Sequence, residues 1–202
     1  MVTTNHRTIK LVQLALFTAI IAIMNLTPLG YIQVTGIAIT LLGIPVTVGA
    51  IFMGPLSGAI LGGVFGLTSF IRCFGLDPFG VFLFGINPVL TFILCMVPRI
   101  LMGWLAGLIF LGMKKIDKKK NIAFAVTNLA GPLLNTVLFM GTLVLFFYNN
   151  ATFSKDIVAG TGATNVLAFI IAAVGVNALV EAGTCFVIGT AVSKVLDVAY
   201  KK

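Results

Sequence analysis

Long apolar stretches take up nearly the whole of this 202-residue chain. A helix needs roughly 20 apolar residues to cross a bilayer, and the chain has room for about six such stretches. Hydrophobic residues make up 59% of the sequence and charged residues only 9%, too little charge to cover the surface of a soluble domain of this size. We therefore predict an all-α membrane protein, a bundle of six transmembrane helices that forms a single integral membrane domain over residues 1–202.

Proline, glycine and polar residues divide the apolar sequence into its helices. Pro28 and Gly30 end the first helix, and the dipeptide Gly54-Pro55 separates the second from the third. We expect helices over 8–26, 37–53, 56–71, 88–112, 122–147 and 165–192. Residues 31–36 are expected to form a semi-polar loop, and residues 72–87 an apolar loop that folds back onto the helices.

The positive charges are distributed unevenly along the chain. Ten of the thirteen Lys and Arg residues lie in three clusters, at the start of the chain, in the 113–121 loop and at the end. Six crossings bring these clusters to one face, which the positive-inside rule makes cytoplasmic. We therefore expect a multi-pass plasma-membrane protein with both termini in the cytoplasm. Because the net charge of +8 reflects this topology next to lipid headgroups, we expect no nucleic-acid partner.

The sequence carries no recognised set of catalytic residues. A phosphate-binding loop is absent, and the only histidine, His6, lies near the N-terminus. Nucleophile motifs and carboxylate pairs are also missing, and Cys73, Cys95 and Cys185 have neither a disulfide nor a metal-ligand spacing. We therefore expect no enzyme, no metal site and no cofactor in this chain, and we interpret the cysteines as small core residues.

Polar residues at membrane depth are the main functional signal, because they are costly in lipid. Arg99 lies near the middle of its predicted helix, and Asn135 lies about as deep in the next one. Asn177 and Glu181 are four residues apart and share a helix face. The candidate substrate-binding residues are Tyr31, Thr68, Arg72, Asn87, Arg99, Asn135, Asn177 and Glu181.

Most of these residues also have a structural interpretation. Arg99 and Glu181 can form a buried ion pair, and the helix asparagines can hydrogen-bond to a neighbouring helix. Asn87 can cap a helix, and Thr68 can bond to its own helix backbone. Arg72 has few local partners beside the apolar loop, which leaves an anionic ligand or snorkelling to the membrane interface as its roles.

Small residues recur at intervals of four in two of the predicted helices. Gly58, Gly62 and Gly66 have this spacing in the third helix, and Ala15 and Ala19 have it in the first. Such spacings allow two helix backbones to approach closely.

Several short motifs, spread over nearly the whole chain, are informative when they are taken together. They are Ala15-x-x-x-Ala19, the runs 43–46, 54–55 and 66–72, Asn87-Pro88, and the runs 97–103 and 131–136. In this combination the chain resembles the substrate-binding S component of energy-coupling factor (ECF) vitamin transporters, most of all the pantothenate-type members.

The resemblance implies a protein that captures a vitamin from outside, in a pocket made by the outer loops and the fourth to sixth helices. The loops after the first and third helices would act as lids. A membrane scaffold subunit, the T component, and two cytoplasmic ATPases that hydrolyse Mg-ATP would supply the energy. Ala15 and Ala19 would face the scaffold.

Pantothenate is a small anion with hydroxyls and an amide, which suits arginine and asparagine side chains. Folate, which is also anionic, and a small vitamin such as pyridoxine are alternatives. Outside the family, a stand-alone secondary transporter or channel that uses Arg99 and Glu181 is the competing hypothesis.

Overall fold

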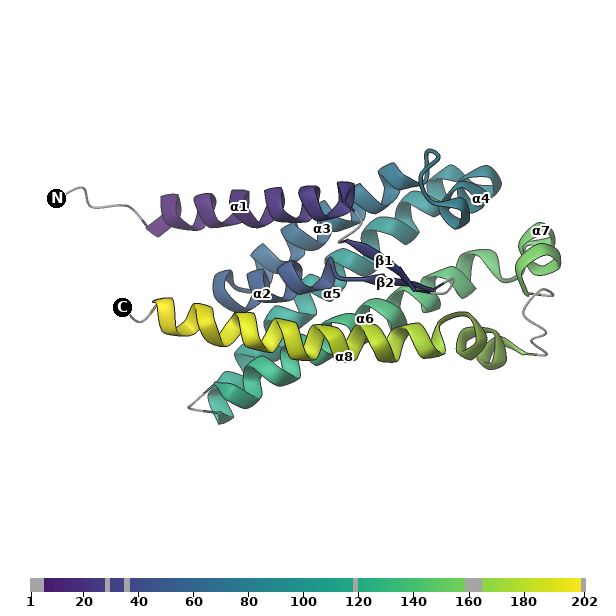
Figure 1. Ribbon diagram of the computed structural model, residues 1–202. Coiled ribbons are helices and arrows are strands. Elements are labelled where there is room, and N and C mark those ends of the chain that lie inside the picture. The colour runs from purple at the N-terminus through teal and green to yellow at the C-terminus, as the bar shows by residue number, and fades with distance from the viewer. Residues whose placement is uncertain (1–5, 28–29, 35–36, 118–119, 159–164, 201–202) are drawn as a thin grey trace.

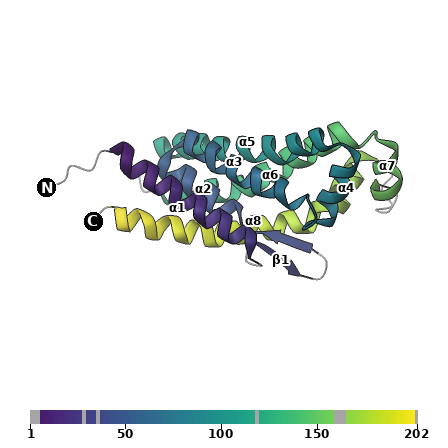
Figure 2. The ribbon, with the colours of Figure 1, turned by 90° about the horizontal axis from the view of Figure 1, so that it is seen from above.

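The computed structural model describes residues 6–27, 30–34, 37–117, 120–158 and 165–200. Its long helices run along one another in an elongated bundle (Figures 1 and 2). The start of α1, the end of α8, the end of α5 and the start of α6 lie at the same end of the bundle (Figure 1). The helices of the bundle are α1 (His6–Leu26), α2 (Gly43–Met53), α3 (Pro55–Arg72), α5 (Pro88–Ile116), α6 (Asn121–Phe147) and α8 (Val166–Tyr200), of which α2 is the shortest.

Shorter elements build the opposite end of the bundle (Figure 1). They are α4 (Pro78–Ile86) and α7 (Ala151–Phe153), which continues into a π-helical turn (Ser154–Val158). Strands β1 (Tyr31–Val34) and β2 (Ile37–Thr40) form an antiparallel hairpin between α1 and α2 in the chain. One apolar core joins α4 and α7 to the long helices, through Leu83, Leu94, Met140, Leu143, Phe147, Phe153, Val158 and Phe169.

The helices expected from hydropathy are present, but several of their ends differ. The second helix was expected to begin at residue 37, whereas Ile37–Thr40 pairs with Tyr31–Val34 and the helix begins at Gly43. β-Branched residues in this segment favour a strand. The 72–87 segment folds back onto the bundle as expected and contains α4. Asp77 caps α4 by accepting a hydrogen bond from the Gly80 amide at 3.1 Å.

Five of the described helices are long and apolar enough to cross a membrane: α1, α3, α5, α6 and the Asn177–Ala199 part of α8. α2 is also apolar but has only 11 residues. Large apolar side chains remain exposed on these helices, for example Leu11 at 66% and Leu145 at 75%. Lipid tails are as apolar as these side chains, so a bilayer can cover them. The chain is therefore a multi-pass membrane protein.

Glycines on α3 bring its backbone against the backbone of α5. Gly58, Gly62 and Gly66 lie four residues apart and face α5. A methyl carbon at Gly66 would lie 2.7 Å from the Cys95 carbonyl oxygen, and one at Gly62 would lie 2.8 Å from the Arg99 carbonyl carbon. Both distances are shorter than van der Waals contact. The glycine spacing therefore brings the helices together as expected, and it fixes where Arg99 and Cys95 lie relative to α3.

A buried hydrogen-bond chain joins α2, α6 and α8. Thr47 Oγ1 donates to Asn128 Oδ1 at 2.9 Å, and Asn128 Nδ2 donates to Ser193 Oγ at 3.1 Å. All three side chains are fully buried. Asn128 thus bonds between helices, which is the structural role expected for an asparagine at membrane depth.

We predict that Gly62→Ala lowers the stability of the bundle by about 1–3 kcal/mol, because α3 and α5 must separate to admit the methyl group. The melting temperature of the purified protein in detergent measures this loss. Gly63→Ala is the matched control, since its methyl group would meet only the Ile100 side chain, at 3.7 and 3.9 Å. Equal melting temperatures for the two variants would contradict a backbone contact at Gly62.

Candidate substrate site

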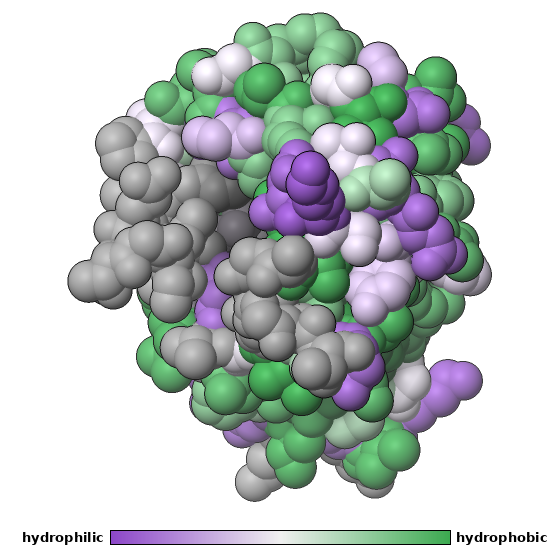
Figure 3. Space-filling model, turned by 90° about the vertical axis from the view of Figure 1, so that its right-hand side faces the viewer, coloured by the Kyte–Doolittle hydropathy of each residue, from purple (hydrophilic) through white to green (hydrophobic). Residues whose placement is uncertain are grey.

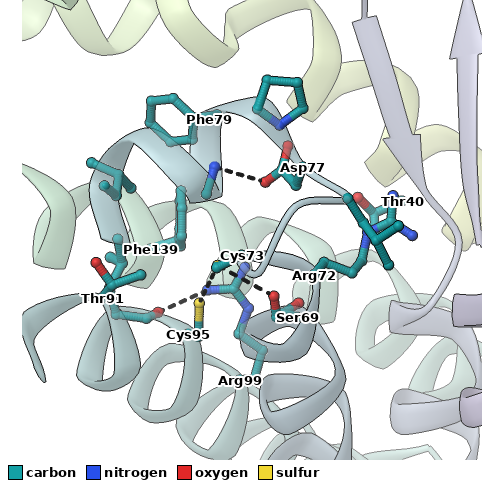
Figure 4. Close-up of a pocket in the computed structure, with 15 residues that line it drawn as sticks. Thr40, Ser69, Arg72, Cys73, Asp77, Phe79, Thr91, Cys95, Arg99 and Phe139 are labelled. Carbon is teal, nitrogen blue, oxygen red and sulfur yellow. Dashed lines mark hydrogen bonds between the residues drawn. The ribbon is translucent and has the colours of Figure 1, made fainter. Parts of the chain in front are cut away.

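A cavity of about 290 Å³ lies between α3, α4 and α5. This volume is at the low end of the range for small-molecule pockets. Phe139 of α6 and Thr40 of β2 complete its wall (Figure 4). The polar and sulfur-containing side chains that line it are Thr40, Ser69, Arg72, Cys73, Asp77, Thr91, Cys95 and Arg99.

Arg99 reaches the cavity wall through a local break in the hydrogen bonding of α5. Pro98 lies inside the helix and has no N–H, so the Leu94 carbonyl lacks its usual helix donor. Arg99 Nη1 donates to this carbonyl at 2.8 Å (Figure 4). The guanidinium carbon also lies 4.4 Å from the centre of the Phe139 ring and 5.6 Å from that of Phe65, within cation–π range. These contacts hold the charged group at the cavity.

The Arg99 guanidinium still has unused donors. Its Nε is buried and has no hydrogen-bond partner among the residues that the structure describes. Among the described residues no salt bridge joins Arg99 to Glu181; the ion pair between Lys120 and Asp197, at 2.8 Å, lies elsewhere. The ion pair considered for Arg99 and Glu181 is therefore not formed. A buried donor without an acceptor is costly, and an anion in the cavity would supply the missing acceptor.

Glu181, Asn135 and Asn177 are buried polar groups on α6 and α8. Glu181 is only 6% exposed and lies within Coulombic range of Arg99. Asn135 Oδ1 and Asn177 Oδ1 are buried and have no hydrogen-bond partner among the described residues. The cavity as it stands is lined by none of these three side chains. The structure therefore leaves the two asparagine oxygens without a hydrogen-bond donor and brings none of the three side chains to the cavity.

The other predicted residues divide between the cavity and local structure. Arg72 lines the cavity, and its Nη1 also donates to the Asn25 carbonyl of α1 at 3.1 Å. Thr68 donates to a carbonyl of its own helix at 2.9 Å. Asn87 caps α5 by accepting from two amides of its first turn, at 3.0 and 3.1 Å. The backbone of Tyr31 is in β1, but its side chain lies outside the described part of the structure.

Comparison with known proteins identifies the family of the chain. Residues 9–193 match the family model described as ECF transporter, substrate-specific component. The chain belongs to this S-component family. The predicted resemblance to S components is therefore confirmed. Members of this family are substrate-binding subunits of transporters and not enzymes, so the chain has a role in transport at the plasma membrane.

Two relatives of this S component carry more specific names. The chain is 30% identical over 203 residues to the pantothenate transporter PanT of Leuconostoc mesenteroides, covering 95% of this chain and 94% of the relative. It is 33% identical over 173 residues to the pantothenic acid transporter PanT of Lactococcus lactis, covering 80% of this chain and 86% of the relative.

The cavity of the S component carries more positive than negative charge. Arg72 and Arg99 line it, and Asp77 is the one described acidic residue in its wall. Because the Asp77 carboxylate already accepts the α4 capping bond, two guanidinium groups dominate the cavity. Such a site favours an anionic ligand.

Figure 3 looks onto the bundle end that carries α4 and α7, where hydrophilic and hydrophobic residues are mixed.

Sequence reasoning missed several residues that line the cavity. Thr91, Cys95 and Arg99 lie four residues apart on α5, so helical periodicity counted back from Arg99 identifies the first two. Ser69 precedes Arg72 by three residues and shares its helix face. Thr91 is fully buried and donates to its own helix backbone at 2.9 Å, so only its place in the wall makes it a candidate.

Ala15 and Ala19 do not line this cavity. Both are exposed on α1, and neighbouring Leu11, Val12 and Leu16 are exposed by 66, 64 and 59%. This apolar helix face is open to lipid or to another membrane protein.

Proposed function

We propose that this S component binds pantothenate in the cavity between α3, α4 and α5 and presents it for ATP-driven uptake. The observation that carries the proposal is the buried, unpartnered Nε of Arg99 at the wall of a compact cavity. The names of the two relatives supply the vitamin. The carboxylate of pantothenate would accept hydrogen bonds from Arg99.

The pairing of Arg99 with a carboxylate follows from the energetics of buried charge. A guanidinium has five N–H donors, and in Arg99 one of its nitrogens is used by the Leu94 carbonyl. A carboxylate can bind the remaining donors in a bidentate, charge-assisted arrangement. Arg72 adds a second positive charge at the same cavity. Both effects favour an anionic ligand over a neutral one of similar size.

The remaining wall suits the rest of the molecule. Ser69 and Thr91 place hydroxyl oxygens in the wall, where they can accept hydrogen bonds from the amide and hydroxyl groups of pantothenate, while Leu94 and Phe139 offer apolar surface for its dimethyl group. The volume of about 290 Å³ favours this compact ligand over folate, whose pteridine, benzoyl and glutamate units form a much longer molecule.

We infer that the chain crosses the membrane six times. α2 has 11 residues and spans about 16 Å, roughly half of the hydrocarbon core. The β1–β2 hairpin would complete this crossing inside the protein, where irregular backbone is tolerated if it lines a cavity. Thr40 of β2 does line the cavity. Six crossings and the three basic clusters then give both termini in the cytoplasm and a cavity facing outside.

Energy would come from partner subunits. A T component in the membrane and two cytoplasmic ATPases that bind Mg-ATP would form the complete transporter, and no cofactor is needed in this chain. The exposed face of α1 at Ala15 and Ala19 is the proposed contact with the T component, because small residues allow close helix packing.

Arg99→Gln should weaken pantothenate binding by roughly 10- to 100-fold, through the loss of charge-assisted hydrogen bonds. Isothermal titration of the purified variant measures this change. Pantothenol, in which an alcohol replaces the carboxylate, is the matched ligand and should lose much less affinity. Arg72→Ala should also weaken the binding of pantothenate more than that of pantothenol, but by a smaller factor. Equal losses for both ligands in Arg99→Gln would contradict a carboxylate contact, and binding of folate but not pantothenate by the wild type would refute the choice of vitamin.

Ala15→Trp and Ala19→Trp should leave pantothenate binding by the isolated S component unchanged but block uptake by the assembled transporter, since a large side chain would hold the T component away. Uptake is measured in liposomes that contain the complete complex. Leu145→Trp, at a position 75% exposed on α6, is the control and should retain uptake. Normal uptake by both alanine variants would exclude this face of α1 as the docking surface.

A further inference from the structure

Two cysteine side chains meet at the wall of the cavity. Cys73 Sγ and Cys95 Sγ lie 3.9 Å apart, and both residues line the cavity (Figure 4). The residues are 4% and 6% exposed, so their sulfurs are sheltered from the surrounding lipid. Vitamin binding as proposed above uses neither thiol.

The two sulfurs are held by helix packing. Side chains lean toward the N-terminus of their own helix, and α3 and α5 run in opposite directions, so Cys73 and Cys95 lean toward each other. The close approach of Gly66 to the Cys95 carbonyl fixes the two helices at this level. Cys73 Sγ also lies 3.5 Å from the Ser69 carbonyl oxygen. The pair is therefore a preformed arrangement of two soft ligands.

We propose that Cys73 and Cys95 bind one soft monovalent cation with a filled d shell, Cu⁺ or Ag⁺, as a two-coordinate thiolate site, and that the bound cation opposes pantothenate binding. Thiolate ligands select such soft ions. Structural Zn²⁺ requires four ligands, and the described residues contain no group of three or more His, Cys, Asp or Glu side chains that could hold a metal ion. The antagonism rests on the proposed vitamin site, whereas the cation site does not.

The sulfur separation favours a bridging cation over a disulfide. Metal–thiolate bonds of about 2.3 Å place the sulfurs of a straight S–metal–S unit about 4.6 Å apart. The observed 3.9 Å is about 0.7 Å short of this value. A disulfide requires sulfurs about 2.05 Å apart. From 3.9 Å the disulfide therefore needs a change of about 1.9 Å in the sulfur separation, and the straight cation complex needs a change of about 0.7 Å.

Charge links this cation site to the vitamin. Two thiols and one M⁺ give a bis-thiolate complex with one negative charge, and two protons are released. Arg99 lies one turn after Cys95 and interacts electrostatically with both cysteines, so its guanidinium would balance the complex. The same guanidinium is proposed to bind the pantothenate carboxylate. Cation and vitamin would therefore compete for Arg99 and for the cavity.

Silver nitrate in chloride-free buffer, added to reduced protein in detergent without oxygen, tests the cation site. One Ag⁺ per chain should be retained against an excess of a competing monothiol, by the wild type and by Cys185→Ser. Cys185 is the matched control, because it lies on α8 and is not part of the pair. Cys73→Ser and Cys95→Ser should each lose the ion. Retention by either of these variants at the wild-type level would overturn the site.

Titration of pantothenate with and without bound Ag⁺ tests the antagonism. The affinity should fall roughly 5- to 100-fold in the wild type and in Cys185→Ser, and Ag⁺ should cause no change in Cys73→Ser or Cys95→Ser. Unchanged affinity in silver-loaded wild type would contradict the antagonism. Failure of reduced, silver-free wild type to bind pantothenate would contradict the proposed function instead, and the retention experiment would still decide the cation site.

Discussion

The glycine contact between α3 and α5 determines where the chemistry of this protein lies. Gly62 and Gly66 meet the backbone of α5 at Arg99 and Cys95, so no side chain separates the two helices at this level. In a membrane, helix association depends on packing and hydrogen bonds, since lipid competes for apolar surface. The same contact sets the register that turns Arg99 and Cys95 toward one cavity. A shift of α5 by one residue would turn both side chains away from α3 and α4.

Within this frame, one proline makes the site possible. Pro98 frees the Leu94 carbonyl, and this carbonyl anchors the Arg99 guanidinium beside the rings of Phe65 and Phe139. The anchor satisfies one nitrogen and leaves Nε buried without an acceptor. A buried donor that gains its acceptor only when an anion binds is well suited to the capture of an anion. In the silver-binding hypothesis, the anionic bis-thiolate complex would use the same property of Arg99.

Hydropathy predicts the long helices of this fold well and its irregular parts poorly. A membrane-spanning helix is recognised from the summed hydropathy of roughly 20 residues, and a single side chain changes that sum very little. The β1–β2 hairpin was missed because Ile37–Thr40 is as apolar as the helix that follows it, and only pairing with Tyr31–Val34 distinguishes the two. At the site, two of the predicted substrate-binding residues, Arg72 and Arg99, line one cavity, and their binding role stays a prediction. The ion pair considered for Arg99 and Glu181 is not formed among the described residues. Helix position alone does not reveal that the Leu94 carbonyl accepts a hydrogen bond from the Arg99 guanidinium.

The structure of the protein bound to pantothenate tests the central role of Arg99 most directly. We expect a carboxylate oxygen at about 2.7–2.9 Å from Arg99 Nε, the distance of a charge-assisted hydrogen bond, with the rest of the vitamin inside the cavity between α3, α4 and α5. A carboxylate bound to Arg72 alone, or a vitamin outside this cavity with Arg99 Nε still unpartnered, would contradict it.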